Sequence, residues 1–411
     1  MKKEMVLIIL ALLVIVIIKS NYHGNVIRTI ESKNEIKLQD PTQQNIQLSP
    51  GGLPTQPYLI ENMCSQIYTN QQYSLPDGSL PSIDGRYVVF SRNNFFGFNF
   101  LGTRITIFNL GSDLKAGTND DSFSTIPTTD NENIRPIVHR LQSNQYEVMW
   151  SSGGSAIVIT NINSCTIPCT TFSTIVTSPS NIIDYDFNED YLVYIRSAGG
   201  VFSGIIELID RNSGSSILIY SGNVVNVEID NNNLIAFRTY NGGFLSNANG
   251  EIYLYHIPTN IITQVTNTPT YESEPVLNPI ANGFSILSHS IQGLSYTFTQ
   301  YLIIDNPTGI SLQNINFPFN LPSPHIFTTV DYFNSVMQVL YEEPSPHKVK
   351  LQRYPLSGPG ANGPSIIYEV PQPAINYPYF STDVSGSNIA LRLVSLANPL
   401  SSYYLLGVSQ C

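Results

Sequence analysis

Residues 82–90, Ser82-Ile83-Asp84-Gly85-Arg86-Tyr87-Val88-Val89-Phe90, are the stretch that decides the fold of this chain. Asp84 and Gly85 signal a turn, because Asp hydrogen-bonds nearby backbone and Gly adopts positive φ angles without strain. The apolar run 87–90 that follows is typical of a buried strand. After a loop, residues 104–110 (RITIFNL) alternate as a half-buried strand does. The unit is therefore a turn, an apolar strand, a loop and an alternating strand.

Further copies of this unit follow along the chain at spacings of about 42 to 60 residues, a period typical of propellers. The apolar first strands are expected at 87–90, 146–150, 191–195, 234–237, 284–287, 336–341 and 389–394. Their alternating partners are expected at 104–110, 156–160, 205–210, 251–257, 301–305, 348–354 and 403–408. One such small sheet cannot bury both of its faces alone. Radial stacking of the copies buries them and leaves only short edges.

The repeat resembles the WD40-like repeat of TolB-type β-propellers, in which a turn with Asp-Gly, an apolar strand, a loop and a second strand precede a Gly turn. Residues 82–90 are the closest copy, the others are degenerate, and none has the Trp-Asp ending of the WD40 repeat proper. The resemblance covers residues 57–411. It implies an all-β fold, a seven-bladed β-propeller, with six blades as the alternative. It implies no particular activity, because this fold serves many unrelated roles.

The last copy supplies only three strands before the chain ends, whereas residues 58–69 (YLIENMCSQIYT) precede the first copy without a sheet of their own. We therefore expect 58–69 to complete the last blade as its outer strand. This placement also brings Cys64 beside Cys411, the final residue. A disulfide between these two cysteines would lock the ring.

The other two cysteines, Cys165 and Cys169, are four residues apart. In an oxidising compartment they are expected to pair with each other. A metal site is one alternative, which the sequence disfavours because no histidine or second cysteine pair lies nearby. The other alternative is that all four cysteines are buried free thiols. We expect neither a metal nor a cofactor.

Residues 5–18 (MVLIILALLVIVII) form an unbroken apolar run with lysines on both sides. As a helix the run measures about 21 Å, so it suits a signal peptide or a short signal anchor. The bulky Ile18 disfavours cleavage, and the leading lysine pair places the N-terminus on the cytoplasmic side. Residues 1–20 are thus expected to hold the chain in a membrane with its body in the periplasm, outside the cell or on a virion surface. Cleavage would make the protein secreted.

Residues 21–56 are polar and contain prolines, which predicts a stalk between the apolar run and the propeller of residues 57–411. The formal net charge of the chain is −11, and 12% of its residues are charged. Recognition of nucleic acid depends on clustered Lys and Arg, and no basic run occurs in the sequence. We therefore expect no nucleic-acid partner.

The sequence contains no GxSxG, HExxH, Walker or Rossmann motif, so no catalytic residue is assigned. No recurrent acidic position is apparent that would bring catalytic carboxylates to the axis of a propeller. Asp120-Asp121 and the segments 186–190 and 230–233 contain oxygen ligands that suit calcium, but turn formation accounts for them.

Cationic side chains end the first strand in several copies, and they are Arg92, Arg196, Arg238 and His289. Equivalent positions of neighbouring blades form an arc around the axis, so these four side chains are expected to gather on one rim. They would either pair with acidic loop residues of the adjacent blade or bind an anion or a carboxylate.

The loops that follow these positions carry aromatic residues beside glycines, a combination common at contact surfaces. The aromatic residues expected to bind a partner are Phe95, Phe96, Phe98, Tyr240, Phe244 and Tyr296. Some of these rings would instead pack between blades. The face as a whole is expected to be a partner-binding surface.

These features predict a membrane-anchored, extracytoplasmic propeller that binds or scaffolds a protein, peptide or glycan on its loop-rich face. Catalysis is not expected, although a propeller hydrolase or lyase with an axial pocket is the alternative. A structural component of a virion or cell envelope is a further alternative, which the low charge and abundant Asn would suit. The fold alone does not decide among these functions.

Overall fold

The computed structural model describes part of the chain, and its described residues are 60–64, 68–75, 80–96, 99–126, 133–162, 171–200, 203–230, 233–241, 249–267, 271–272, 275–280, 283–292, 295–306, 309–315, 320–321, 326–333, 336–343, 348–355, 366–370, 378–398 and 401–411. Their regular structure is made of strands, apart from the short 3-10 helix η1 (Ile257–Thr259). The apolar run 5–18 and the expected stalk 21–56 lie outside the described residues. Among the helices that the structure describes, none has the length and apolarity needed to span a membrane.

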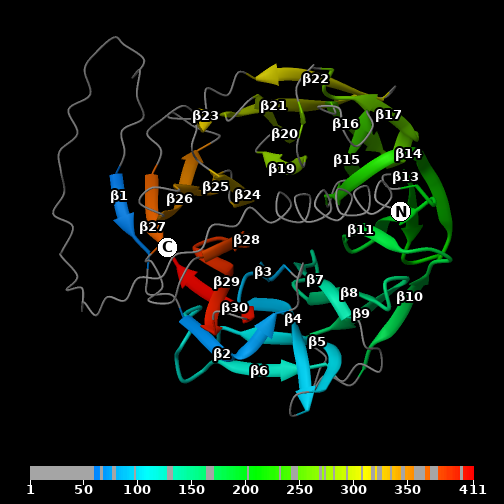
Figure 1. Cartoon of the computed structure of the whole chain (residues 1–411). Helices are drawn as coiled ribbons and strands as arrows, with labels where there is room; N and C mark the ends of the chain where they lie inside the picture. Colours follow the sequence, from blue (N-terminus) through cyan, green and yellow to red (C-terminus); the bar gives the residue numbers. More distant parts are fainter. Residues whose placement is uncertain are drawn as a thin grey trace, which may run out of the picture.

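Six hydrogen-bonded sheets among the described residues follow one another around a ring (Figure 1). The first sheet contains β3 (Ser82–Asp84), β4 (Tyr87–Phe96), β5 (Asn99–Asn109) and β6 (Ser122–Thr125). The second sheet contains β7 (Asn133–Arg140), β8 (Tyr146–Ser152), β9 (Ala156–Asn161) and β10 (Ser173–Thr177). In both sheets each strand pairs antiparallel with the next one along the chain.

The third sheet has seven strands because β14 belongs to two four-stranded groups. Its strands are β11 (Ile182–Phe187), β12 (Tyr191–Ser197), β13 (Ser203–Asp210), β14 (Ser216–Ile229), β15 (Leu234–Asn241), β16 (Asn249–His256) and β17 (Ile261–Gln264). Residues 216–223 of β14 pair with β13, and residues 224–229 pair with β15. One strand is therefore the last of one group and the first of the next.

The remaining three sheets complete the ring. The fourth contains β18 (Tyr271–Glu272), β19 (Val276–Ile280), β20 (Gly283–Gln292), β21 (Ser295–Asn306), β22 (Gly309–Ile315) and β23 (Asn320–Leu321). The fifth contains β24 (Ile326–Phe333), β25 (Val336–Glu343), β26 (Lys348–Pro355), β27 (Ile366–Val370) and β1 (Ile60–Met63). The sixth contains β28 (Pro378–Ser385), β29 (Asn388–Asn398), β30 (Ser401–Gln410) and β2 (Tyr68–Leu75).

The two strands expected in each copy are present as antiparallel pairs at all of the predicted places. The first strand of each pair is an apolar run because both of its faces are covered by neighbouring sheets. In β12, for example, Leu192, Val193, Tyr194 and Ile195 are all buried. The second strand shows the expected alternation in β13, where half-buried and buried residues alternate along most of the strand. These expectations are confirmed.

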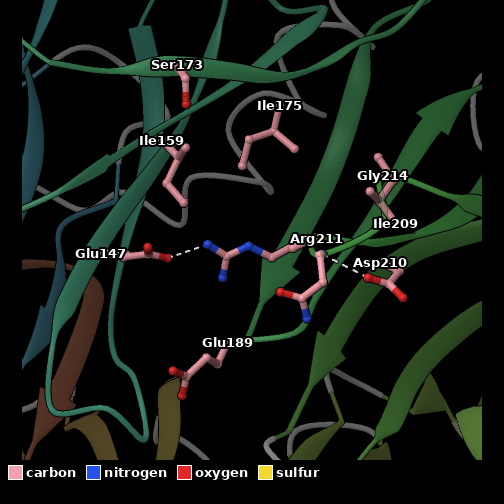
Figure 2. Close-up of a pocket in the computed structure, with 10 residues that line it drawn as sticks. Glu147, Ile159, Ser173, Ile175, Glu189, Ile209, Asp210, Arg211 and Gly214 are labelled. Atoms are coloured by element: carbon pink, nitrogen blue, oxygen red, sulfur yellow. Dashed lines mark hydrogen bonds and ion pairs between the residues drawn. The ribbon is translucent and has the colours of Figure 1, made fainter.

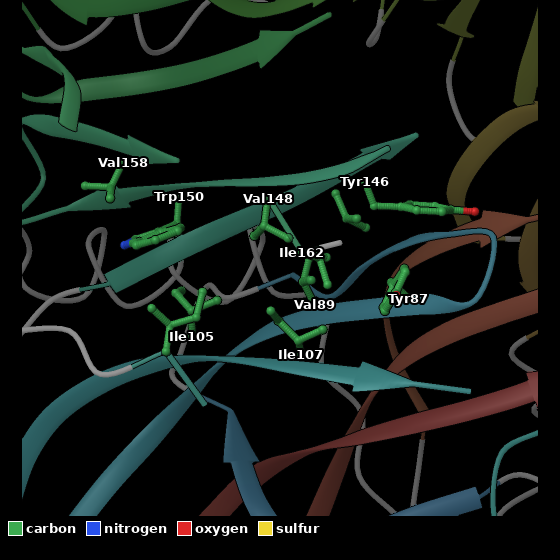
Figure 3. Packing of buried hydrophobic residues seen from close by; sticks show 11 residues of the cluster. Tyr87, Val89, Ile105, Ile107, Tyr146, Val148, Trp150, Val158 and Ile162 are labelled. Atoms are coloured by element: carbon green, nitrogen blue, oxygen red, sulfur yellow. The ribbon is translucent and has the colours of Figure 1, made fainter. Parts of the chain in front are cut away.

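The hydrophobic core lies between neighbouring sheets. Val148 and Trp150 of β8 pack with Ile105 and Ile107 of β5, from the sheet next to their own (Figure 3). Trp150 has no exposed surface. Further clusters join the second sheet to the third, the fifth to the sixth, and the sixth back to the first. Burial of apolar surface therefore holds the ring together around its circumference.

The first strands of the groups lie nearest the centre of the ring, as the labels of β3, β7, β11, β19, β24 and β28 show, whereas β6, β10, β17 and β22 lie at its periphery (Figure 1). Contacts between β28 and β3, β3 and β7, β11 and β14, and β24 and β28 link these inner strands. Sheets that radiate from an axis, each with its first strand innermost, form a β-propeller. The all-β propeller fold expected from the sequence is present.

The two ends of the described chain meet at one place in the ring. β2 pairs antiparallel with β30, so a strand from near the start of the body completes the sheet of the last three strands. β1 instead pairs in parallel with β27 of the fifth sheet. Residues 58–69, which we expected to form the outer strand of the last blade, thus divide between two sheets, and the strand beside β30 begins at Tyr68.

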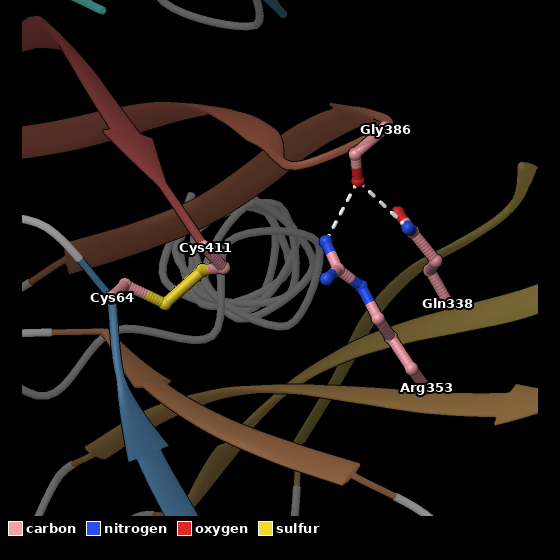
Figure 4. Close-up of a disulfide and its surroundings, with 5 residues drawn as sticks. All are labelled: Cys64, Gln338, Arg353, Gly386 and Cys411. Atoms are coloured by element: carbon pink, nitrogen blue, oxygen red, sulfur yellow. Dashed lines mark hydrogen bonds between the residues drawn. A yellow bond between two sulfur atoms is a disulfide. The ribbon is translucent and has the colours of Figure 1, made fainter. Parts of the chain in front are cut away.

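A disulfide joins Cys64, between β1 and β2, to Cys411, with their Cα atoms 4.3 Å apart (Figure 4). Beside it, the side chains of Arg353 and Gln338 both donate hydrogen bonds to the carbonyl oxygen of Gly386, at 2.8 and 2.7 Å. These contacts tie the fifth sheet to the turn between β28 and β29. Cys165 and Cys169 lie outside the described residues, so their expected pairing remains a prediction.

Candidate functional site

The innermost strand of every group carries a polar residue close to the turn that follows it. In six groups this residue faces the third residue of the following strand, counted from the turn between the two. In the second group Val138 faces the third residue, and the polar residue is its neighbour His139, which faces the second. These polar residues are Ser82, His139, Asp186, Glu228, Asn278, Asp331 and Asp383. Four of them are acidic. An acidic residue therefore recurs in the innermost strands, contrary to expectation, and Ser82, His139 and Asn278 in the other copies hide the repeat.

Several of the described side chains at this position connect neighbouring innermost strands. Asp383 Oδ2 accepts hydrogen bonds from the hydroxyl of Ser82 at 3.0 Å and from the backbone N–H of Ile83 at 2.8 Å. Asp186 Oδ2 accepts the N–H of Ile229 at 2.9 Å. Glu228 accepts the N–H of Leu277 in the same way, at 3.1 Å. Each carboxylate thus satisfies a backbone donor of the next group, which fixes adjacent groups against one another.

His139 extends this arrangement, since its Nε2 lies 2.8 Å from Asp186 Oδ1. Burial lowers the pKa of His139, but the charge and hydrogen bond of Asp186, with smaller contributions from Asp84 and Asp383, raise it to about 9. The imidazole is therefore protonated at neutral pH. A protonated histidine cannot accept a proton as a general base does, and we assign this polar position a structural role.

The four cationic residues expected on one rim occupy different registers. Arg92 and Arg196 each lie five residues after the first residue of their strand, Arg238 lies four residues after Leu234, and His289 lies six after Gly283. Successive side chains of a strand point to opposite faces. Arg238 therefore points to the opposite face of its sheet from Arg92 and Arg196.

Two of these arginines are engaged inside the protein. Arg196 Nε donates to Glu207 Oε1 at 2.8 Å, and Glu207 belongs to the neighbouring strand of the same sheet rather than to an adjacent blade. Arg238 is 7% exposed and donates to the carbonyl oxygen of Glu272 at 3.2 Å. Arg92 is half-buried. The side chain of His289 lies outside the described residues, although its backbone pairs with Phe298.

The aromatic residues of the same face are described only in part. Tyr240 is half-buried near the end of β15. For Phe95, Phe96 and Tyr296 the structure describes the backbone within β4 and β21 but not the side chain. Phe98 and Phe244 lie outside the described residues. The partner-binding role of this face remains a prediction.

A pocket of about 380 Å³ lies between the second sheet and the β11–β14 group of the third (Figure 2). Ile159, Ile175 and Ile209 form its aliphatic wall. Its polar wall consists of Glu147, Ser173, Glu189, Asp210, Arg211 and Asn212. Several of these residues come from the turn after β13 and the turn after β11. The pocket therefore lies towards the end of the sheets where these turns gather.

An ion pair between Glu147 and Arg211 forms one side of the pocket. Arg211 Nη2 lies 2.5 Å from Glu147 Oε2, and each side chain is 14% exposed (Figure 2). The other terminal nitrogen of Arg211 donates to the carbonyl oxygen of Asn188. The guanidinium also lies over the ring of Phe187, 5.7 Å from its centre. Three neighbours therefore hold the Arg211 side chain in place.

Asp210 and Glu189 supply further negative charge to the pocket. Hydrogen bonds from the backbone of Ser213 and Asn212 lower the pKa of Asp210, so that it stays ionised. Glu189 accepts a hydrogen bond from the N–H of Ser143 at 3.3 Å. Three carboxylates and one guanidinium line the pocket, so its lining carries an excess of two negative charges. The sequence did not reveal this candidate site, because Glu147 and Arg211 are 64 residues apart and neither belongs to a motif.

The described residues contain no group of three or more His, Cys, Asp or Glu suited to a metal ion. Asp120 and Asp121, considered for calcium, bind their own loop: Asp120 accepts from Ser112 and Thr118, and Asp121 from Gly117 and Thr118. Asp186 and Asp230 bond to backbone N–H groups of Ile229 and Leu234. Turn and strand formation thus account for these acidic residues.

No protein-family model and no curated protein matches the sequence. The fold is similar to that of an acylaminoacyl peptidase in complex with a chloromethyl ketone, with a TM-score of 0.50 and 10% identity over 81% of this chain and 51% of that one. The β-propeller domain of the Trilobed protease from Pyrococcus furiosus has a TM-score of 0.49, at 13% identity over 82% and 95% of the two chains. The polysaccharide lyase Uly1 has a TM-score of 0.49, at 9% identity over 88% and 94%. These similarities concern the fold alone.

Proposed function

We propose that this protein is a binding module, a propeller that receives part of a partner in the pocket between its second sheet and the β11–β14 group. The observation that carries the proposal is the pocket itself, which has an aliphatic wall together with a fixed ion pair and further carboxylates. Binding sites combine apolar surface with a few placed polar groups in this way. The partner is a protein, peptide or glycan.

In this proposal the propeller has seven blades. β14 is counted twice, as the outer strand of the group that begins with β11 and as the inner strand of the group that ends with β17. With this division, each of seven groups begins with a strand that carries the polar position of the inner ring. The alternative of six blades would leave one blade with seven strands.

We also propose that the body lies outside the cytoplasm. The support is the disulfide between Cys64 and Cys411, since such bonds persist in oxidising compartments. In this proposal residues 5–18 anchor the chain in a membrane and residues 21–56 separate the anchor from the propeller. If residues 1–20 were cleaved, the body would be secreted.

A hydrolase or lyase is the second candidate. Two of the compared structures are a peptidase and a polysaccharide lyase, although the similarity concerns the fold alone. Within the described residues, His139 and Asp186 of the innermost strands form a His–Asp pair, and its imidazole is protonated at neutral pH. It is therefore unsuited to act as a base. Binding explains the pocket without further assumptions.

Site-specific photo-cross-linking tests the proposed function. A benzophenone amino acid replaces Asn212, which lines the pocket, in the full chain in cell membranes, and the control places it at the exposed Leu101 of β5. The expected result is a discrete cross-linked partner from position 212 and none from position 101. Identical adducts from both positions, or none from position 212, would contradict the proposal.

A further inference from the structure

We propose that the pocket binds a lysine or arginine side chain from an extended segment of a partner polypeptide. This inference rests on the proposed function and specifies its ligand. It follows from four features of the pocket: the engaged arginine, the excess of carboxylates, the aliphatic wall and the neighbouring sheet edge.

The engaged arginine decides against an anionic ligand. Arg211 donates to Glu147 and to the carbonyl oxygen of Asn188 with its two terminal nitrogens, and its plane lies over Phe187. An anion in the pocket would have to compete with the Glu147 carboxylate for the same guanidinium. It would also meet Glu189 and Asp210, and like charges repel.

The remaining carboxylates favour a cation. Glu147 is already paired, whereas Glu189 and Asp210 have no cationic partner among the ion pairs of the described residues. The backbone hydrogen bonds of Asp210 hold its carboxylate in one orientation and keep it ionised. A fixed carboxylate loses little freedom when a cation arrives, so its charge contributes fully to binding.

The aliphatic wall favours a cation on an alkyl stem. Ile159, Ile175 and Ile209 line the pocket together with the charged groups. The stems of Lys and Arg cover apolar surface while the charged end stays among polar groups. A compact inorganic cation would leave the three isoleucines in contact with water.

The neighbouring sheet edge favours a polypeptide over a free amine. Ser173 and Ile175 belong to β10, the outermost strand of its sheet among the described residues. Such a strand offers backbone N–H and C=O groups to another chain. An extended segment can pair with this edge and place one side chain in the pocket, which is how strand addition combines affinity with specificity.

Fluorescence anisotropy with two labelled pentapeptides tests the inference on the full chain in detergent micelles. The probes are Gly-Ile-Lys-Ile-Gly and the same peptide with norleucine in place of lysine, which keeps the stem and removes the charge. We expect the lysine peptide to bind about tenfold more tightly, the equivalent of one charge-assisted contact. Added salt should reduce this difference.

Variants of the carboxylates locate the effect. Glu189→Gln and Asp210→Asn should each weaken binding of the lysine peptide by about three- to tenfold, and Asn at position 210 still accepts the turn hydrogen bonds. Glu189→Lys should weaken it further and favour the same peptide with glutamate at the centre. The matched control is Asp113→Asn, an exposed acidic residue in the turn region after β5, which should leave binding unchanged.

The outcomes separate the ligand from the function. Equal affinity for the lysine and norleucine peptides, or an unchanged affinity in all three pocket variants, would overturn the inference about charge. If neither peptide binds while position 212 still yields its cross-linked partner, the ligand class is wrong and the binding function stands. If both experiments are negative, the proposed function fails as well.

Discussion

Replacing both Cys64 and Cys411 by alanine should markedly destabilise the propeller. The disulfide links two residues that are 347 positions apart in sequence, at the place where the N-terminal strands join the C-terminal sheet. Cys64 is 7% exposed and packs with Leu340, Leu351 and Leu391. Alanine is preferred to serine for this variant, since a buried hydroxyl without a partner would add its own cost.

The expected loss follows from the length of chain that the bond encloses. In the chain-entropy model, a separation of 347 residues corresponds to about 6 kcal/mol at 25 °C, which is an upper bound because measured disulfides usually contribute about 2–5 kcal/mol. We therefore expect the free energy of unfolding to fall by about 4 kcal/mol. With a urea dependence of about 3 kcal/mol per molar, the midpoint would move by roughly 1 M.

Urea unfolding followed by the fluorescence of Trp150 measures this effect directly. Trp150 is the only tryptophan of the chain, it is fully buried, and it lies in the second sheet, away from the disulfide. The matched control replaces Cys165 and Cys169, whose short separation limits any contribution to about 2 kcal/mol in the same model. The reasoning would be refuted if the Cys64/Cys411 variant unfolded at the same urea concentration as the unmodified protein, or at a higher one than the control.

Three further perturbations test the interior of the ring. The pKa of His139 is raised from 6.5 to about 9, so its contribution to the free energy of unfolding is complete below pH 6.5 and is lost as the pH rises through 9. After allowance for the 38% exposure of the side chain, this contribution is about 1–2 kcal/mol. Urea titration at several pH values measures it, and the pH dependence should be absent in His139→Gln. Trp150→Ala should cost about 3–5 kcal/mol by circular dichroism, since it empties the core between two sheets; a cost below 1 kcal/mol would contradict the packing. Asp383→Ala should cost about 1–3 kcal/mol by leaving the N–H of Ile83 unpaired, and Asp383→Asn should recover part of it; equal losses in both variants would argue against the hydrogen bond.

The sequence predicts the second and third strands of each group well, for a physical reason. A second strand such as β12 is buried on both faces and reads as an apolar run, and the alternation of β13 reflects one covered and one half-covered face. These patterns survive even in degenerate copies. The disulfide between Cys64 and Cys411 was predictable for a similar reason, since a ring needs its ends fixed together.

The inner polar position and the pocket could not be predicted in the same way. Ser82, His139 and Asp186 of the innermost strands each make a different hydrogen bond to a neighbouring group, so the residue type varies from copy to copy. The register also shifts by one residue at His139. The pocket depends on a turn of one sheet that reaches Glu147 of another. The sequence alone also gives no register for the arginines of the expected rim, and a shift of one residue turns Arg238 to the opposite face of its sheet from Arg92 and Arg196.

The sharing of β14 between two groups has a consequence for how the molecule opens. Residues 216–229 form one uninterrupted strand, so the hydrogen bonds to β13 and those to β15 are anchored in the same backbone. Loss of the hydrogen bonds of one group therefore destabilises those of the other, and the two groups form a single cooperative unit of local unfolding. Elsewhere in the ring, for example between β6 and β7, the chain leaves one group before it enters the next. Proteolytic nicks or circularly permuted termini are accordingly better tolerated there than within β14.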